Sequence, residues 1–235
     1  MKKIKTITHY MMDRAQQGVL IWTFLLLIGF VPVASALPSL QLDILGGTYD
    51  GATETIVASS DPFTLYALLM PSSDTPISDI YYISAALVPM VGAADYGSFI
   101  FAGTTINVTT DMVYGIPPLE ADLGEDLGDL LPKHGIFPAF FSEFYFTFDL
   151  ANTSVPYNTI DDAGAGPSGS GSMYYNAFTV DTSGLTPGVA IHFDLYNKET
   201  DGTDVDIKAF APFSHDAQSM GEGFLRFLFR SQPLF

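Results

Sequence analysis

Three aspartates lie within six residues of one another in the segment ETDGTDVD, residues 199–206. Asp201, Asp204 and Asp206 offer carboxylate oxygens around a glycine turn, and such hard oxygen ligands are what Ca²⁺ prefers. The spacing differs from that of an EF-hand loop, so a solvated acidic turn is the alternative interpretation. We predict a calcium site at these three aspartates, and the sequence indicates no other cofactor. A second acidic segment, residues 119–131, allows the same two interpretations.

His192 lies two residues before Asp194 in an alternating run typical of a strand, so both side chains should project from one face. No Gly-x-Ser-x-Gly motif and no cysteine supplies a nucleophile beside them. Zinc motifs of the His-Glu-x-x-His type are absent as well. We therefore predict a non-enzymatic protein without catalytic residues, and the sequence assigns no ligand-binding residue.

Paired carboxylates provide one remaining catalytic alternative. A glycoside hydrolase needs two of them roughly 5 to 9 Å apart across a cleft. Four acidic residues lie on strand-like segments and could form such a pair: Glu143, Asp149, Asp194 and Asp206. The sequence alone does not bring any two of them together, so hydrolysis ranks third among the functions considered.

The first 36 residues have the three-part layout of a cleaved signal peptide. Four basic residues lie between positions 2 and 14, an apolar run follows from Val19 to Val31, and Ala34 and Ala36 occupy the small-residue positions before a cleavage site. The apolar run is shorter than the roughly 20 residues of a membrane-spanning helix. We predict export, with an uncleaved N-terminal anchor as the alternative.

The rest of the chain is strongly acidic. Without residues 1–36 it keeps 5 Lys and Arg against 25 Asp and Glu, a net charge of −20. Such a surface repels nucleic acid and anionic lipid headgroups, so neither is an expected partner. The chain also has no cysteine, which for an exported protein favours a bacterial envelope over a eukaryotic secretory pathway.

Short runs of β-branched and aromatic residues alternate with turn residues from position 37 onward. Five of the clearest runs are 40–44, 63–69, 80–91, 140–150 and 189–195. They predict an all-β fold, a single antiparallel β-sandwich of jelly-roll or immunoglobulin-like type, with a barrel as the competitor. The Gly- and Ser-rich segment 161–172 has the composition of a flexible loop within that domain.

Four segments together resemble the bacterial choice-of-anchor N proteins: LQLDILGGTYD at 40–50, PKHGIFP at 132–138, IHFDLYN at 191–197 and AFAPFSHDA at 209–217. The resemblance covers residues 37–217 and implies an exported surface protein of the PEP-CTERM-like kind, in which the homology domain precedes a C-terminal sorting signal. This chain departs from that pattern after Ala217, where no Pro-Glu-Pro motif is found. The resemblance implies no catalytic residues.

We therefore expect a signal peptide at 1–36, a β-sandwich at 37–217 and a tail without a sorting anchor at 218–235. The predicted protein is a secreted or cell-surface component of a Gram-negative-type bacterium, without a stable membrane span, associated with exopolysaccharide or other envelope components. A calcium-assisted, lectin-like carbohydrate-binding module is the main alternative. For that role, exposed tyrosines such as Tyr81, Tyr174 and Tyr175 would stack on sugar rings.

Overall fold

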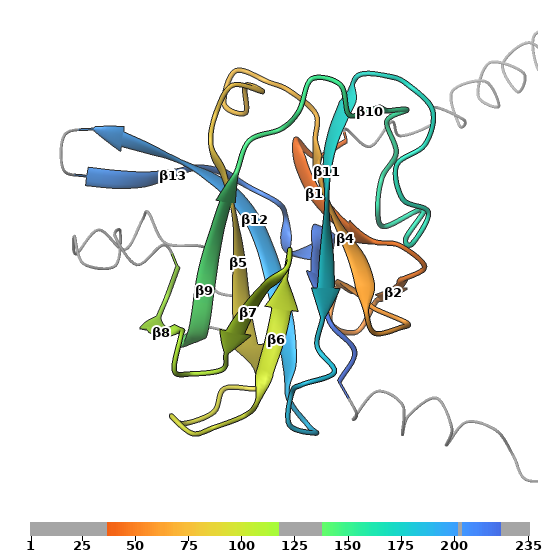
Figure 1. Cartoon of the computed structure of the whole chain (residues 1–235). Coiled ribbons are helices and arrows are strands. Elements are labelled where there is room, and N and C mark those ends of the chain that lie inside the picture. The colour runs from red at the N-terminus through yellow and green to blue at the C-terminus, as the bar shows by residue number, and fades with distance from the viewer. Residues whose placement is uncertain (1–36, 118–137, 202–203, 222–235) are drawn as a thin grey trace, which may run out of the picture. The chain divides into compact units, whose positions relative to one another are not determined.

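The apolar and aromatic runs form strands that assemble into two sheets (Figure 1). The computed structural model describes residues 37–117, 138–201 and 204–221. In these ranges the single helical element is the 3₁₀ turn η1 (Phe213–His215). No helix among the described residues has the length and hydropathy needed to cross a bilayer.

The first sheet, sheet A, is antiparallel throughout, and its central strands are β4 and β11. Alternation in β4 places Phe63, Leu65 and Ala67 in the core, while Thr64 and Tyr66 are half-exposed. In order across sheet A, the strands are β1 (Leu40–Ile44), β4 (Phe63–Leu69), β11 (Met173–Asp181), β6 (Ser98–Phe101) and β7 (Thr104–Asn107), with β10 (Thr153–Ser154) beside β11.

The second sheet, sheet B, is mixed, because β14 runs parallel to β3 whereas the other pairs are antiparallel. Its centre is formed by β12, which pairs with β5, β13 and β14. In order across sheet B, the strands are β2 (Thr48–Asp50), β3 (Thr55–Val57), β14 (Asp216–Gln218), β12 (Ala190–Asp201), β5 (Tyr81–Val88), β9 (Ala139–Phe146) and β8 (Val113–Gly115), with β13 (Asp204–Phe210) beside β12.

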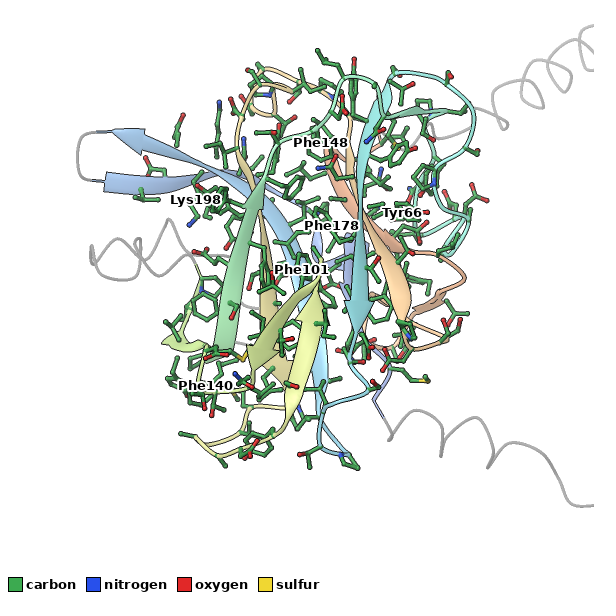
Figure 2. All side chains as sticks on the ribbon, viewed as in Figure 1. Tyr66, Phe101, Phe140, Phe148, Phe178 and Lys198 are labelled. Carbon is green, nitrogen blue, oxygen red and sulfur yellow. The ribbon has the colours of Figure 1, made fainter. Side chains whose placement is uncertain are left out.

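One aromatic-rich core fills the space between the sheets. Phe101 of sheet A stacks on Phe144 of sheet B with ring centroids 4.1 Å apart, and it also contacts Phe178 at 5.2 Å and Phe193 at 6.3 Å. Figure 2 shows Phe101 and Phe178 between the two layers. The prediction of an all-β sandwich is confirmed.

The strand that carries His192 extends well beyond its predicted end. β12 continues from Leu195 through the polar residues that follow to Asp201, and β13 returns beside it. In Figure 1 the β12–β13 hairpin projects past the remainder of the sandwich. The acidic segment therefore forms the end of a two-stranded ribbon, where the sequence alone indicated only a turn.

The Gly- and Ser-rich segment packs against β1. Asp43 is fully buried, and its Oδ1 accepts the Gly164 N–H at 2.9 Å. Its Oδ2 accepts the Gly166 N–H at 3.1 Å and the Tyr157 hydroxyl at 2.9 Å. Burial raises the pKa of Asp43, and these hydrogen bonds counteract only part of that rise.

Gly164 allows the close approach of this segment to β1. Its φ is +82°, and a Cβ there would lie 2.3 Å from the carbonyl oxygen of Gly47. Gln41 provides a second anchor: its Oε1 accepts the Thr159 N–H at 3.0 Å and its Nε2 donates to the Tyr157 carbonyl at 3.2 Å. The composition indicated flexibility, but the structure holds this segment with buried hydrogen bonds.

Candidate functional site

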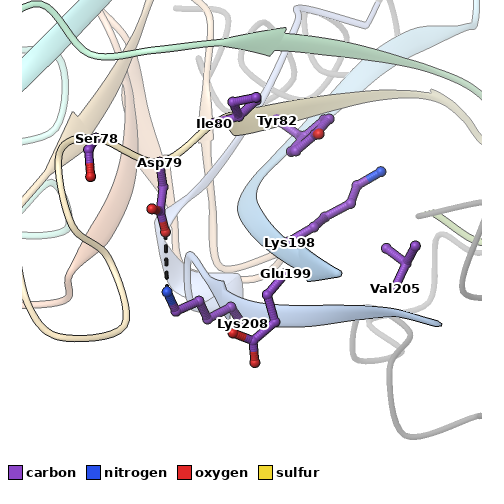
Figure 3. Close-up of a pocket in the computed structure, with 8 residues that line it drawn as sticks. All are labelled: Ser78, Asp79, Ile80, Tyr82, Lys198, Glu199, Val205 and Lys208. Carbon is purple, nitrogen blue, oxygen red and sulfur yellow. Dashed lines mark hydrogen bonds and ion pairs between the residues drawn. The ribbon is translucent and has the colours of Figure 1, made fainter. Parts of the chain in front are cut away.

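A groove of about 540 Å³ lies at the base of the projecting hairpin, on the face of sheet B that is turned away from the main core (Figure 3). It is built by β12, β13 and the start of β5 with the turn before it. Eight residues line it: Ser78, Asp79, Ile80, Tyr82, Lys198, Glu199, Val205 and Lys208.

Three tyrosines form a row across sheet B beside this groove. Tyr82 pairs with Tyr145 on β9 and with Tyr196 on β12, and directly paired residues project from the same face of a sheet. The Tyr82 and Tyr196 rings are nearly parallel, at 12°, with centroids 5.9 Å apart. Tyr196 is fully buried, whereas Tyr145 is 77% exposed. The row therefore ends in an aromatic ring that is available to a ligand.

Lys198 is held above this row by two kinds of contact. Its Nζ lies 4.2 Å from the centroid of the Tyr82 ring and 3.1 Å from Glu143 Oε1. The Tyr196 hydroxyl also donates to Glu143. Because the amine, the ring and the carboxylate fix one another, this side of the groove is preorganised.

A second ion pair lies on the opposite side of the groove. Lys208 Nζ is 3.3 Å from Asp79 Oδ2, and the same oxygen accepts from Asn197 Nδ2 at 3.2 Å (Figure 3). Lys198 and Lys208 are the two Lys or Arg residues of the described ranges, which contain 19 Asp and Glu residues. Both cations therefore lie at one groove in an otherwise acidic body.

The predicted calcium ligands lie on the hairpin beyond the groove. Backbone pairing sets Asp201 opposite Asp204 and Glu199 opposite Asp206, and the pair of Thr200 with Val205 lies between them. Residues 202–203 and the side chains of Asp201 and Asp204 are outside the described part of the structure. The calcium site at Asp201, Asp204 and Asp206 thus stays a prediction.

His192 and Asp194 come together as their spacing predicted, and a third residue joins them. His192 Nε2 lies 3.6 Å from Asp194 Oδ1 and 3.2 Å from Asp216 Oδ2. Asp216 arrives through the pairing of β14 with β12, which sequence reasoning missed because β14 has only three residues. Burial opposes a charge on His192, but the carboxylates of Asp194 and Asp216 outweigh it and raise the pKa of His192 to about 10. All three side chains are buried.

The tyrosines named from the sequence do not line the groove on sheet B. Tyr81 is fully buried and donates its hydroxyl to the Pro76 carbonyl at 2.8 Å, so the expectation of an exposed ring was wrong. Tyr174 and Tyr175 are half-buried in sheet A, where Tyr175 packs edge-on against Tyr66. Tyr145 carries the exposed ring, and the alternation of residues 140–150 placed it opposite the core-facing phenylalanines.

Several predicted features fall outside the described residues. These are the cleavage positions Ala34 and Ala36, the acidic segment 119–131, His134, and residues 222–235 of the tail. Comparison with known proteins found no match to this chain among protein-family models, curated proteins or solved structures.

Proposed function

We propose that this protein is an exported, non-enzymatic β-sandwich of the bacterial surface or extracellular matrix, and that its groove binds polysaccharide. The observation that carries the proposal is the exposed Tyr145 ring, which adjoins Tyr82 at a groove whose two lysines are already fixed by ion pairs.

The groove offers the two kinds of contact that a sugar ring needs. The face of a tyrosine ring stacks on the apolar C–H face of a pyranose, and Tyr145 adds this contact with little loss of conformational entropy. Around it, lysine amines donate to hydroxyl groups, whereas the Asp79 and Glu199 carboxylates accept from them. Because Lys198 and Lys208 are preorganised, a ligand meets side chains that do not have to be ordered first.

The charge balance favours a neutral polysaccharide. Two lysines and two carboxylates line the groove, so their formal charges cancel. Lys198 is further neutralised by Glu143, and the whole chain carries a net charge of −17. A polyanion would have to approach against that charge without finding an uncompensated cation, whereas a neutral glycan has no such cost.

Affinity electrophoresis and a glycan array provide the test, with neutral and uronic-acid polysaccharides tested in parallel. We expect binding to a neutral glycan to weaken at least tenfold in Tyr145→Ala. Tyr114→Ala is the matched control, because Tyr114 is also an exposed tyrosine of sheet B, at 55%, but it pairs with Phe140 and not with Tyr82 of the groove.

Two other results would contradict the proposal. Binding to no polysaccharide would overturn it, and binding only to uronic-acid polymers would overturn the charge argument. A chelator arm with Ca²⁺ added back separates the calcium-assisted alternative, since glycan binding that is lost in chelator and restored by Ca²⁺ would assign a role to the acidic end of the hairpin. Release of reducing sugar during incubation would instead support a glycoside hydrolase.

A further inference from the structure

We infer that His192, Asp194 and Asp216 form a binding site for a divalent transition-metal ion such as Zn²⁺. The inference is independent of the polysaccharide groove, because it rests on a different cluster. It also differs from the calcium prediction, which concerns the end of the β12–β13 hairpin.

The separations between the three side chains fit a coordination sphere. Each residue contributes one ligand atom, and these atoms all lie within 4.8 Å of one another. Two of the separations, from His192 Nε2 to the Asp216 and Asp194 oxygens, are 3.2 and 3.6 Å. Neighbouring ligands of a tetrahedral zinc ion with bonds of about 2.0–2.1 Å are about 3.3–3.4 Å apart. The two observed separations bracket that value.

Two carboxylates face one ring nitrogen in this cluster. Asp216 Oδ2 lies 3.2 Å from His192 Nε2, and Asp194 Oδ1 lies 3.6 Å from the same atom. The ring carries at most one hydrogen on Nε2. A cation between them would be bound by all three groups.

Asp216 provides a second observation that points to a ligand. The residue is only 3% exposed, and its Oδ1 is buried without accepting a hydrogen bond. The Thr55 hydroxyl, which lies beside this carboxylate, donates to the Thr53 carbonyl at 3.1 Å. Since a buried carboxylate oxygen without a partner is costly, a metal ion that binds this carboxylate would remove the cost.

The donor set selects the class of metal. One imidazole nitrogen and two carboxylate oxygens suit zinc and its neighbours, whereas Ca²⁺ takes six to eight oxygens and Mg²⁺ retains several waters. The Asp194 side chain is 11% exposed, against 1% for His192 and 4% for Asp216. An ion would therefore enter beside Asp194, where water could complete the coordination. A ligating imidazole must be neutral, so a metal ion and a proton compete for His192.

Metal binding to the full chain after chelator treatment provides the test. Co²⁺ is titrated and followed by its visible absorption, and Zn²⁺ is followed by calorimetry and by thermal unfolding. The chain has no cysteine, so no thiolate band obscures the cobalt spectrum. We expect one Co²⁺ per chain, displacement by Zn²⁺, and a rise in Tm of several degrees at saturating Zn²⁺.

Substitutions assign the site. Asp216→Asn should weaken Zn²⁺ binding at least a hundredfold, and Asp194→Asn should do the same. Asp181→Asn, which changes a half-buried carboxylate at the end of β11, and Asp206→Asn, on the hairpin, should leave binding unchanged. Far-ultraviolet circular dichroism checks that each variant is folded.

Two outcomes would overturn the inference. One is unchanged cobalt binding in the Asp216→Asn variant, and the other is the absence of Co²⁺ and Zn²⁺ binding to the wild-type chain. The wild-type measurement decides on its own if a variant at the cluster fails to fold.

Discussion

Replacing Asp43 should detach the segment that follows Ser154 from β1 and destabilise the whole sandwich. In Asp43→Ala, the N–H groups of Gly164 and Gly166 and the Tyr157 hydroxyl lose their acceptor. A buried donor without a partner costs about 1–3 kcal/mol, so three of them correspond to about 3–9 kcal/mol. The variant also removes the free-energy cost of burying the Asp43 carboxylate, a cost that the raised pKa of Asp43 reflects. Part of the lost stability is therefore recovered. We expect a net loss of about 3–5 kcal/mol in the free energy of unfolding.

Asp43→Asn is the matched control. The amide keeps one carbonyl oxygen for Gly164 and the shape of the side chain, and the Tyr157 hydroxyl can rotate to accept. We expect this variant to lose only about 1–2 kcal/mol.

Urea unfolding of both variants measures these losses, and limited proteolysis within residues 161–172 reports local release. The explanation fails if Asp43→Ala loses less than about 1 kcal/mol. It fails equally if Asp43→Asn is as destabilised as Asp43→Ala, or if the segment resists protease in both.

Two further perturbations test the packing and the protonation of the fold. Phe101→Ala removes the ring that stacks on Phe144, and we expect the free energy of unfolding in urea to fall by about 3–5 kcal/mol. A fall no larger than that of the surface variant Tyr114→Ala would contradict this expectation. His215 is 5% exposed, and burial lowers its pKa from 6.5 to about 4. Because the pKa of His215 is lower in the folded state, the neutral side chain contributes up to about 3 kcal/mol to the free energy of unfolding above pH 6.5. This contribution is lost as the pH falls through about 4. Unfolding measured in chelator should therefore show a weaker acid dependence in His215→Gln than in the wild type, and equal slopes would refute this assignment.

Periodicity was sufficient to predict the longer strands. Alternation in residues 63–69 and 140–146 distinguishes a core face from an outer face, and both runs form strands of the sandwich. The same alternation predicts that Tyr145 points away from the core phenylalanines. Its place beside Tyr82 could not be predicted, because strand pairing is not encoded in either strand alone.

Three-residue strands carry too little pattern to be recognised. β14 pairs with β3 in parallel and with β12 in antiparallel orientation, and these pairings bring Asp216 to His192. The composition of residues 161–172 also led to a wrong expectation of a flexible loop. The glycines of this segment allow its backbone to pack closely on β1. The last residues of β12 were missed because their polar side chains resemble a turn, although they pair with β13.

The β12–β13 hairpin has a consequence for behaviour at high concentration. Within the described strands β13 pairs only with β12, so its other side is an edge to which a second molecule could add a strand. Charged residues alternate along β13 at Asp204, Asp206 and Lys208. Charges on an edge strand oppose sheet extension between molecules, because pairing would desolvate them or bring like charges together. The hairpin can therefore project from the sandwich without seeding aggregation in a concentrated solution.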